Sequence, residues 1–423
     1  MTADHDLAAR RDAALGRSYR LFYDRPVHPV RAEGVWLHDA DGTAYLDCYN
    51  NVPCIGHCHP RVTQALATQA ARLNTHTRYL DETIVAYAED LLALLPAGLD
   101  RLNLTCTGSE ANDLALRVAM QVTGGRGVVV TDWAYHGGTV AVAGISPSLV
   151  PQVPGHVRAV APPNPRAQDM EAEAARFAQD VAVAFADLLA AGHAPCALVL
   201  DTILSSDGII ADPPGLLRGA EAAARSAGAL VIADEVQAGF GRIGASFWGF
   251  ARHGMQPDMV TLGKPMGAGH PIAGLVLRAD LAEQFGRETR YFNTFGGNPV
   301  SCAVAQTVLD VLREEELPQN ADRVGTSLQE GLRDLATRHT EIADVRGAGL
   351  FIGVDIAVRD DPDRPDPARA AALVEGLKTR GVLLSTSARA GNVLKIRPPL
   401  VFSDAHAARL LDALAAETVR VAA

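Results

Sequence analysis

The 423-residue chain exceeds the size at which one hydrophobic core stops growing, so we expect a large domain with a smaller one attached. Its 48% hydrophobic and 21% charged residues exclude a disordered protein, and its net charge of −11 excludes a binder of nucleic acid. No apolar run approaches the roughly 18 residues that span a bilayer, which excludes a membrane span. The polar start, MTADHDLAARRDAALGR, predicts a cytoplasmic protein whose partners are small molecules or further copies of the chain.

The first part of the chain alternates apolar and polar residues. Between residues 20 and 50 this alternation surrounds an Asp-Gly turn, and it predicts a short β-meander. We assign residues 1–60 to the N-terminal part of the small domain.

From about residue 60, helical periods alternate with short β-rich runs. Strands separated by helices imply an α/β domain with a mostly parallel sheet that is covered by helices on both faces. We assign residues 61–305 to this domain, and within it residues 151–180 to a Pro-rich loop that leads into a helix. The β-rich runs are LNLTC, GVVVTD, ALVLDT, ALVIADEV, DMVTLG and IAGLVLR.

Beyond about residue 305, long amphipathic helices give way to short strands such as GLFIGVDIA and NVLKIRPPL. This pattern predicts that residues 306–423 form the C-terminal, α+β part of the small domain. We expect this part to pack with the N-terminal meander.

An acid and a lysine stand at the ends of two strands of the predicted sheet. Asp234 ends the run ALVIAD, and Lys264 follows DMVTLG thirty residues later, between Gly263 and Pro265. Open α/β sheets bind ligands at this carboxyl edge. An aspartate can keep a pyridine nitrogen protonated while a lysine amine forms a Schiff base, so the pair indicates a pyridine cofactor. A lone lysine at a strand end would more often be a solvated charge, but the flanking glycines and the upstream aspartate favour the cofactor.

Two nucleotide motifs fail in this sequence. A phosphate loop ending at Lys264 needs a glycine where Asp258 stands, and the stretch Gly347–Gly353 has one residue too many for a dinucleotide fingerprint. An ATP or NAD enzyme is therefore disfavoured.

Small and aromatic residues follow two further strands. Gly108 and Ser109 lie between a strand and a helix, where backbone N–H groups and a hydroxyl can hold a phosphate at the positive helix end. Tyr135 and His136 follow GVVVTD at the same edge, where an aromatic ring could stack on a cofactor. Standing alone, the first feature could be an ordinary helix cap and the second ordinary packing.

The six cysteines are too few for a disulfide scaffold, so we expect free thiols. Cys48, Cys54, His57, Cys58 and His59 have the side chains that bind zinc but lack the paired C-x-x-C spacing of structural sites. We therefore expect no metal here and favour a small-residue loop packed near an active site.

Five motifs occur together in a characteristic order: GSEAND, the YHG turn, DEVQAGFGR, the LGKPMG lysine turn and TFGGNP. In this order they resemble class III aminotransferases of pyridoxal-phosphate (PLP) fold type I, over about residues 25–415. The resemblance implies that the mostly parallel sheet of the large domain has seven strands. The resemblance implies PLP as cofactor, a homodimer with a shared active site, Lys264 as the Schiff-base and proton-transfer lysine and Asp234 as the partner of the pyridine nitrogen. It further implies cofactor contacts from Gly108 and Ser109 at the phosphate, Tyr135 on the ring beside His136, Gln237 near the phenolic oxygen and Thr294 at the phosphate of the neighbouring subunit's cofactor.

Two departures from the family pattern bear on the reaction. Asp201 stands where many members have a Glu-Pro pair, in a segment similar to the dialkylglycine decarboxylase pattern but with Asp207 in place of a glycine. Lys395 stands at the family's usual carboxylate-binding arginine, with Arg397 two residues on and on the same strand face. A lysine suits a phosphate dianion better than a planar carboxylate.

The runs YNNVPCIGHCHP, NTHTRYL, LGKPMGAGHP and KIRPP resemble the phospho-lyase branch, which includes ethanolamine-phosphate and phosphohydroxylysine phospho-lyases. We therefore predict a phospho-lyase for a small phosphorylated amine such as O-phosphoethanolamine, with Arg78, Lys395 and Arg397 as candidates for the substrate anion. Arg78 or Lys395 could instead only pair with an acidic neighbour. The alternative is a transaminase that moves an amino group from an amine or ω-amino acid to a keto acid. A dialkylglycine decarboxylase-type activity and a non-catalytic binding protein are less favoured.

Overall fold

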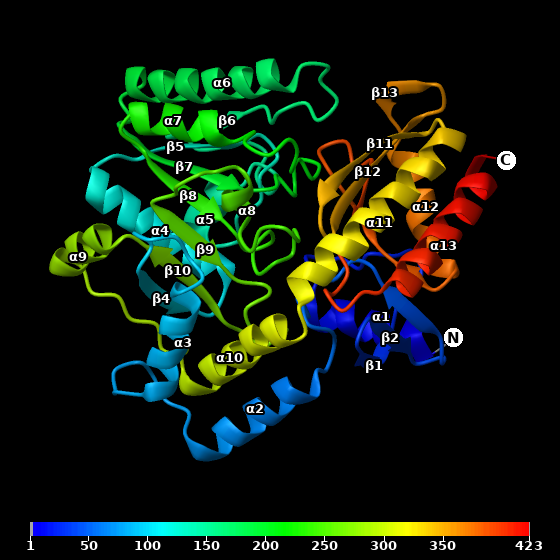
Figure 1. Cartoon of the computed structure of the whole chain (residues 1–423), viewed down its shortest axis with the longest axis horizontal. Coiled ribbons are helices and arrows are strands. Elements are labelled where there is room, and N and C mark those ends of the chain that lie inside the picture. The colour runs from blue at the N-terminus through cyan, green and yellow to red at the C-terminus, as the bar shows by residue number, and fades with distance from the viewer. Residues whose placement is uncertain (1–2, 423) are drawn as a thin grey trace.

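A seven-stranded sheet forms the centre of the larger part of the molecule in the computed structural model, which describes residues 3–422 (Figure 1). The strand order is β4-β10-β9-β8-β7-β5-β6, and β10 alone runs antiparallel to its neighbours. The predicted mostly parallel seven-stranded sheet is thus confirmed. Its strands are β4 (Arg101–Thr105), β5 (Gly127–Thr131), β6 (Val157–Val160), β7 (Pro195–Asp201), β8 (Leu230–Asp234), β9 (Met259–Leu262) and β10 (Ala273–Leu277).

Helices cover both faces of this sheet, so its strands are apolar on both sides and every residue of β5, β9 and β10 is buried. One face packs against α4 (Gly108–Thr123), which also contacts α5 (Val140–Gly144) and α9 (Ala279–Glu288). The other face packs against α6 (Met170–Ala190) and α7 (Arg218–Ser226). Around this body lie α2 (Pro60–Arg72), α3 (Glu82–Leu92), α8 (Gly249–Arg252) and α10 (Pro299–Glu314).

One strand lies where the sequence predicted only a loop. β6 (Val157–Val160) falls inside the segment 151–180 and pairs in parallel with β5. Its four residues stand between two proline-containing stretches, so they were too few to reveal a strand period. The helix predicted after them begins at Met170.

The smaller part contains residues from both ends of the chain. β3 (Ala44–Asp47) of the N-terminal meander pairs in parallel with β14 (Val382–Leu383) from the C-terminal segment. The domain limits at residues 60 and 305 stay a prediction, but this pairing shows how the two ends join. The other elements here are β1 (Pro29–Glu33), β2 (Trp36–Asp39), β11 (Ile342–Ala348), β12 (Phe351–Val358), β13 (Asp361–Pro365), β15 (Ser385–Ser387), β16 (Val393–Ile396), α11 (Leu317–Arg338), α12 (Pro367–Thr379) and α13 (Asp404–Ala422).

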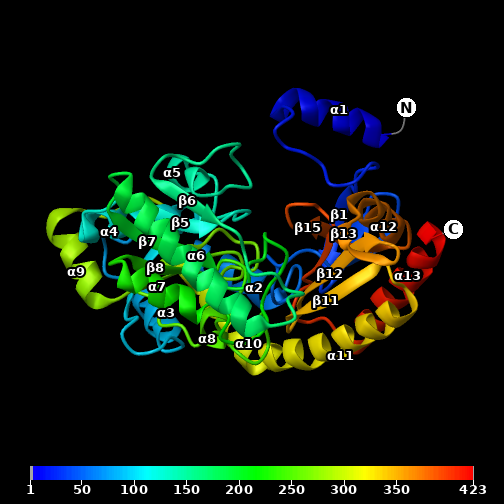
Figure 2. The ribbon, with the colours of Figure 1, turned by 90° about the horizontal axis from the view of Figure 1, so that it is seen from above.

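The helix α1 (Ala3–Leu15) stands apart from the rest of the small part in Figure 2. Its residues show no amphipathic helical period, so the polar start does not predict this helix. Among the helices of residues 3–422, none combines the length and the apolar character that crossing a membrane requires.

Candidate active site

Lys264 and Asp234 meet at the carboxyl edge of the large sheet, as their positions after two parallel strands predict. Asp234 is the last residue of β8 and pairs in register with Thr261 of β9, so the turn after β9 brings Lys264 beside it. Between them lies a small pocket of about 100 Å³. The pocket is lined by Gly108, Ser109, Tyr135, His136, Gly137, Asp201, Asp234, Val236, Gln237 and Lys264.

Donor groups surround the Asp234 carboxylate and fix its direction. Oδ2 accepts a hydrogen bond from Asn112 Nδ2 at 3.0 Å and lies 2.7 Å from His136 Nδ1, while Oδ1 accepts from the Val236 N–H at 3.1 Å. Asn112 also accepts from the Thr261 hydroxyl at 2.8 Å, so the side chain is held in one orientation. Sequence reasoning missed Asn112, although it lies within the GSEAND motif on α4, one turn after Gly108.

The Lys264 amine lies among charges of both signs. Desolvation by burial lowers the pKa of Lys264, and Arg397 lowers it further, whereas Asp234 and Asp201 act in the opposite direction. A lysine with a lowered pKa carries more of the neutral, nucleophilic amine at neutral pH.

Close packing at the start of α4 shapes the phosphate end of the pocket. Thr107 caps the helix, and the Ser109 Oγ accepts a hydrogen bond from the Gly138 N–H at 3.1 Å. A Cβ at Gly137, whose φ is +138°, would lie 2.4 Å from Ser109 Oγ, so this loop can approach the helix only as glycine. The exposed Tyr135 lies beside this approach, at the mouth of the pocket.

The donor set fits PLP. It offers a carboxylate for the ring nitrogen, an amine for the carbonyl carbon, a helix N-terminus with a serine for the phosphate and an aromatic ring for the pyridine face. His136 Nε2 is buried without a hydrogen-bond partner among residues 3–422, which leaves a polar atom beside the place of the ring.

The segment after β7 connects this pocket to the substrate side. Asp201 Oδ2 accepts from the Ser205 hydroxyl at 2.5 Å, and Ser205 Oγ in turn accepts from Gln237 Nε2 at 2.5 Å. Burial raises the pKa of Asp201, and the nearby Asp234 raises it further. The Ser205 carbonyl accepts from Lys395 Nζ at 3.1 Å, so one residue contacts both the cofactor pocket and the predicted anion site.

Asp207 joins the same segment to the loop that carries Tyr135. Its carboxylate accepts from the Thr131 hydroxyl at 2.8 Å and from the Trp133 N–H at 3.1 Å. Burial raises the pKa of Asp207 to about 7, and Asp201 adds to the effect. Neither Ser205 nor this role of Asp207 could be predicted, because the contacts join segments far apart in the chain.

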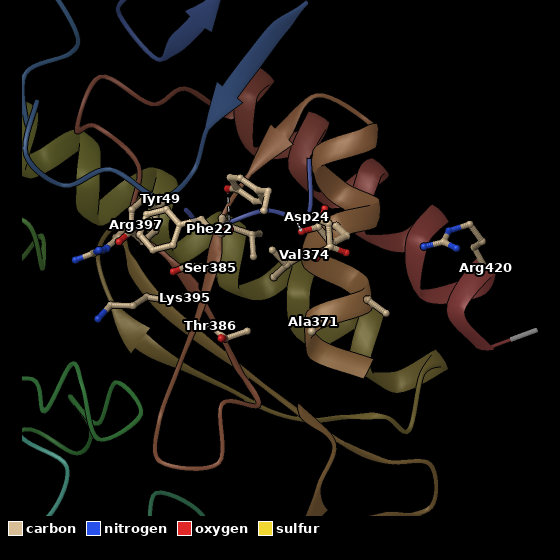
Figure 3. A pocket seen from close by; sticks show the side chains of 14 residues that line it. Phe22, Asp24, Tyr49, Ala371, Val374, Ser385, Thr386, Lys395, Arg397 and Arg420 are labelled. Atoms are coloured by element: carbon tan, nitrogen blue, oxygen red, sulfur yellow. Dashed lines mark hydrogen bonds between the residues drawn. The ribbon is translucent and has the colours of Figure 1, made fainter. Parts of the chain in front are cut away.

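Lys395 and Arg397 lie together at one end of a second cavity of about 690 Å³ (Figure 3). Each residue is only 7% exposed, and both side chains point to the same side of the strand, as their spacing predicts. The Arg397 guanidinium lies 4.5 Å from the Tyr49 ring centroid and donates to Gln237 Oε1. The cavity is also lined by Phe22, Tyr23, Asp24, Tyr49, Ala371, Ala372, Val374, Glu375, Leu384, Ser385, Thr386 and Arg420.

Two predicted site residues lie outside both cavities of the single chain. Arg78 is exposed, and its guanidinium lies over the Phe292 ring at 3.8 Å. Thr294 is exposed in the neighbouring loop. Neither residue contacts the pocket that contains Lys264, so any role in a site depends on a second subunit.

The loop with the cysteine and histidine cluster packs against the lysine turn. Cys54 Sγ donates to the Pro265 carbonyl at 3.1 Å, and His57 Nε2 lies 2.7 Å from Asp47 Oδ2. Within the part of the chain that the structure describes, no three His, Cys, Asp or Glu side chains are grouped to hold a metal ion.

Comparisons with known proteins agree with this geometry. The family model for aminotransferase class III matches residues 22–417. A Drosophila melanogaster protein named alanine–glyoxylate aminotransferase 2-like is 39% identical over 95% of this chain and 84% of its own length. A Caenorhabditis elegans protein named ethanolamine-phosphate phospho-lyase homolog 1 is 35% identical over 97% and 92%. A solved phospholyase from Arthrobacter, in complex with phosphoethanolamine, superposes with a TM-score of 0.95 and is 45% identical over 98% of this chain and 99% of its own.

Proposed function

The chain belongs to the class III aminotransferase family of PLP enzymes, and within this family we propose that it is a phospho-lyase that eliminates phosphate from a small phosphorylated amine. The observation that carries the proposal is the buried pair of Lys395 and Arg397 at the end of the 690 Å³ cavity. The similarity to the Arthrobacter phospholyase and to the nematode phospho-lyase homologue supports it.

We propose the following roles for the residues of the cofactor pocket. The Lys264 amine would hold the cofactor and, as a free amine, would take the proton from the amine-bearing carbon of the substrate. Asp234 keeps the proton on the ring nitrogen, and Asn112 and His136 hold Asp234 in place. When bound, PLP supplies an electron sink that makes the proton of the substrate carbon acidic. Gly108 and Ser109 hold the phosphate, Tyr135 covers the ring and Gln237 contacts the phenolic oxygen.

Two basic side chains that lie side by side in a buried place suit an anion. Burial lowers the pKa values of both Lys395 and Arg397, and Arg397 adds to the effect on Lys395. A phosphate dianion brings two negative charges and several acceptor oxygens, so it satisfies both cations at once. Arg397 Nε has no hydrogen-bond partner among residues 3–422 and is available for such an oxygen.

We expect the enzyme to release phosphate from O-phosphoethanolamine without any keto acid. Elimination restores the starting form of the cofactor at every cycle, whereas transamination stops after one half-reaction unless a keto acid accepts the amino group. Purified protein is incubated with O-phosphoethanolamine, and free phosphate and ammonia are measured over many turnovers. The control repeats the incubation with added pyruvate and with a simple amine as substrate.

A transaminase is the second candidate, because the fly relative is named for an aminotransferase. It predicts the opposite pattern: amines or ω-amino acids turn over only with a keto acid, and O-phosphoethanolamine releases no phosphate. That pattern would overturn the phospho-lyase proposal. A purely binding role has less support, since Lys264, Asp234 and the phosphate end of the pocket are all in place.

We also propose that the active unit is a homodimer. Leu80, Tyr79 and Phe295 are large apolar side chains with exposed fractions of 103%, 65% and 71%, in the same region as Arg78 and Thr294. Apolar side chains exposed together in this way indicate a protein interface. A partner seated there brings Arg78 and Thr294 towards the neighbouring site, as the resemblance implies for Thr294.

Sedimentation equilibrium is expected to give the mass of two chains for the wild-type protein. Leu80→Glu places a charge in the interface and is expected to shift the protein towards the single-chain mass. The matched control is Val183→Glu, because Val183 is an exposed apolar residue on α6. A wild-type protein with the mass of one chain contradicts the proposal.

A further inference from the structure

Lysine is rare in this chain, and its placement is uneven. Only three of the 38 Lys and Arg residues are lysines, namely Lys264, Lys378 and Lys395. Two of these three line the cavities of the candidate site. Arginine stays charged in proteins, whereas a buried lysine can give up and regain a proton. A chain that otherwise uses arginine therefore has lysine at two places where a proton can move.

Lys395 and Arg397 differ in how their cationic groups are held. The Lys395 Nζ makes one hydrogen bond, to the Ser205 carbonyl at 3.1 Å, and it lies 5.4 Å from the Phe351 ring centroid. In its protonated form this amine has three N–H donors, so it retains the capacity to donate into the cavity that Lys395 lines. The Arg397 guanidinium, in contrast, is fixed between Tyr49 and Gln237.

The pKa of Lys395 depends on the charged groups that surround its amine. Burial and Arg397 lower the pKa of Lys395 well below its ordinary value, and Lys264 acts in the same direction, while Asp201 and Asp207 oppose them. A phosphate dianion beside the amine favours the charged form and raises the pKa again. An anion bound beside the amine therefore favours its ammonium form, which can donate a proton.

Elimination of phosphate needs a proton at a defined atom. If the carbon–oxygen bond breaks without one, the electron pair stays on an oxygen that already belongs to a dianion, and the leaving group is a strongly basic trianion. A proton delivered to the bridging oxygen avoids this species. Lys264 is on the other side of the reaction, where it removes the proton from the amine-bearing carbon.

We propose that Lys395 is a catalytic residue that donates this proton to the bridging oxygen of the leaving phosphate. The inference rests on the proposed phospho-lyase function. The C–H electron pair becomes a carbon–carbon double bond, the carbon–oxygen pair stays on the bridging oxygen, and that oxygen takes the proton from the Lys395 ammonium. Phosphate leaves as its monohydrogen dianion, and neutral Lys395 takes a new proton from solvent when the next phosphorylated amine binds. Arg397 holds the non-bridging oxygens throughout.

Lys395→Arg separates proton donation from charge, because arginine keeps the charge but does not give up a proton. We compare release of phosphate from O-phosphoethanolamine with release of sulfate from O-sulfoethanolamine. Sulfate is a weakly basic leaving group that needs no proton. The variant is expected to lose about 10²-fold or more of kcat for phosphate release while its sulfate release changes by less than about tenfold. An equal loss for both esters, or phosphate release near the wild-type rate, overturns the inference.

Binding of inorganic phosphate gives a measurement that does not depend on turnover. Calorimetry in two buffers of different ionisation heat measures the protons taken up on binding. We expect the uptake at pH 7.5 to be greater in the wild-type holoenzyme than in Lys395→Arg, because an arginine keeps its proton whether or not the anion is bound. Equal uptake in both proteins overturns the inference.

The matched control is Lys378→Arg. Lys378 is as buried as Lys395, but it donates to the Arg25 carbonyl and lines neither cavity. Its replacement is expected to leave the ratio of phosphate to sulfate release unchanged, and a change of that ratio like that of Lys395→Arg would contradict the assignment.

A wild-type enzyme that releases no phosphate overturns the proposed function together with this inference. A wild-type enzyme that releases it, next to a Lys395→Arg variant that does so equally well, overturns this inference alone.

Discussion

Lys264→Ala is expected to lower turnover by at least about 10³-fold, because one side chain supplies both the covalent attachment and the proton transfer at the substrate carbon. The variant should still bind PLP, more weakly, since Asp234, Ser109 and Tyr135 remain in the pocket. Borohydride reduction followed by peptide mapping should find the cofactor on the peptide containing Lys264 in the wild-type protein and on no peptide in the variant. The visible absorbance of the lysine-bound cofactor should disappear with it.

Lys378→Ala controls for the loss of a buried lysine elsewhere, because its amine donates to the Arg25 carbonyl and Lys378 does not line the cofactor pocket. It should keep the cofactor on Lys264. A Lys264→Ala protein with near-normal activity would show that another residue does this work and that the assignment is wrong.

The large sheet and its ligand edge could be predicted because each depends on local patterns. Apolar runs separated by helical periods predicted six of its seven strands. Because parallel strands end at the same carboxyl edge, the sequence also predicted that Asp234 and Lys264 lie close together. This rule does not tell which of two adjacent carboxylates enters the pocket. Glu235 stands next to Asp234, but it does not line the pocket, and its carboxylate accepts hydrogen bonds from the Gly249 and Phe250 N–H groups.

Contacts between distant segments were beyond the reach of the sequence. Ser205 hydrogen-bonds Gln237 and Lys395, which lie 32 and 190 residues away along the chain, and no local spacing indicates such a meeting point. The contact between the Tyr49 ring and the Arg397 guanidinium likewise forms only when the two ends of the chain fold together in the small part. These residues shape the substrate side, which explains why the sequence predicted the cofactor more readily than the substrate.

Asp234→Asn is expected to lower kcat by about 10²-fold or more with the fold retained, because the neutral amide cannot hold the ring nitrogen in its protonated, electron-withdrawing form. The substitution also disturbs the hydrogen bonds. All three neighbours, Asn112 Nδ2, His136 Nδ1 and the Val236 N–H, lie where the carboxylate can accept. An amide has only one oxygen, so at least one donor loses its acceptor, which should cost about 1–3 kcal/mol of stability. Steady-state kinetics and thermal unfolding measure the two effects separately.

Asp132→Asn is the matched control for this change. Asp132 directly follows β5 at the same edge of the sheet, but its carboxylate pairs with the exposed Arg389 at 3.0 Å and does not line the cofactor pocket. Loss of an exposed ion pair should change stability by less than about 1 kcal/mol and should leave kcat within about twofold. If Asp234→Asn lowers kcat by less than about tenfold, the ring nitrogen does not depend on Asp234. In that case the hydrogen bonds of Asn112 and His136 to Asp234 serve only to hold the end of β8 against α4. Another group must then keep the proton on the ring nitrogen.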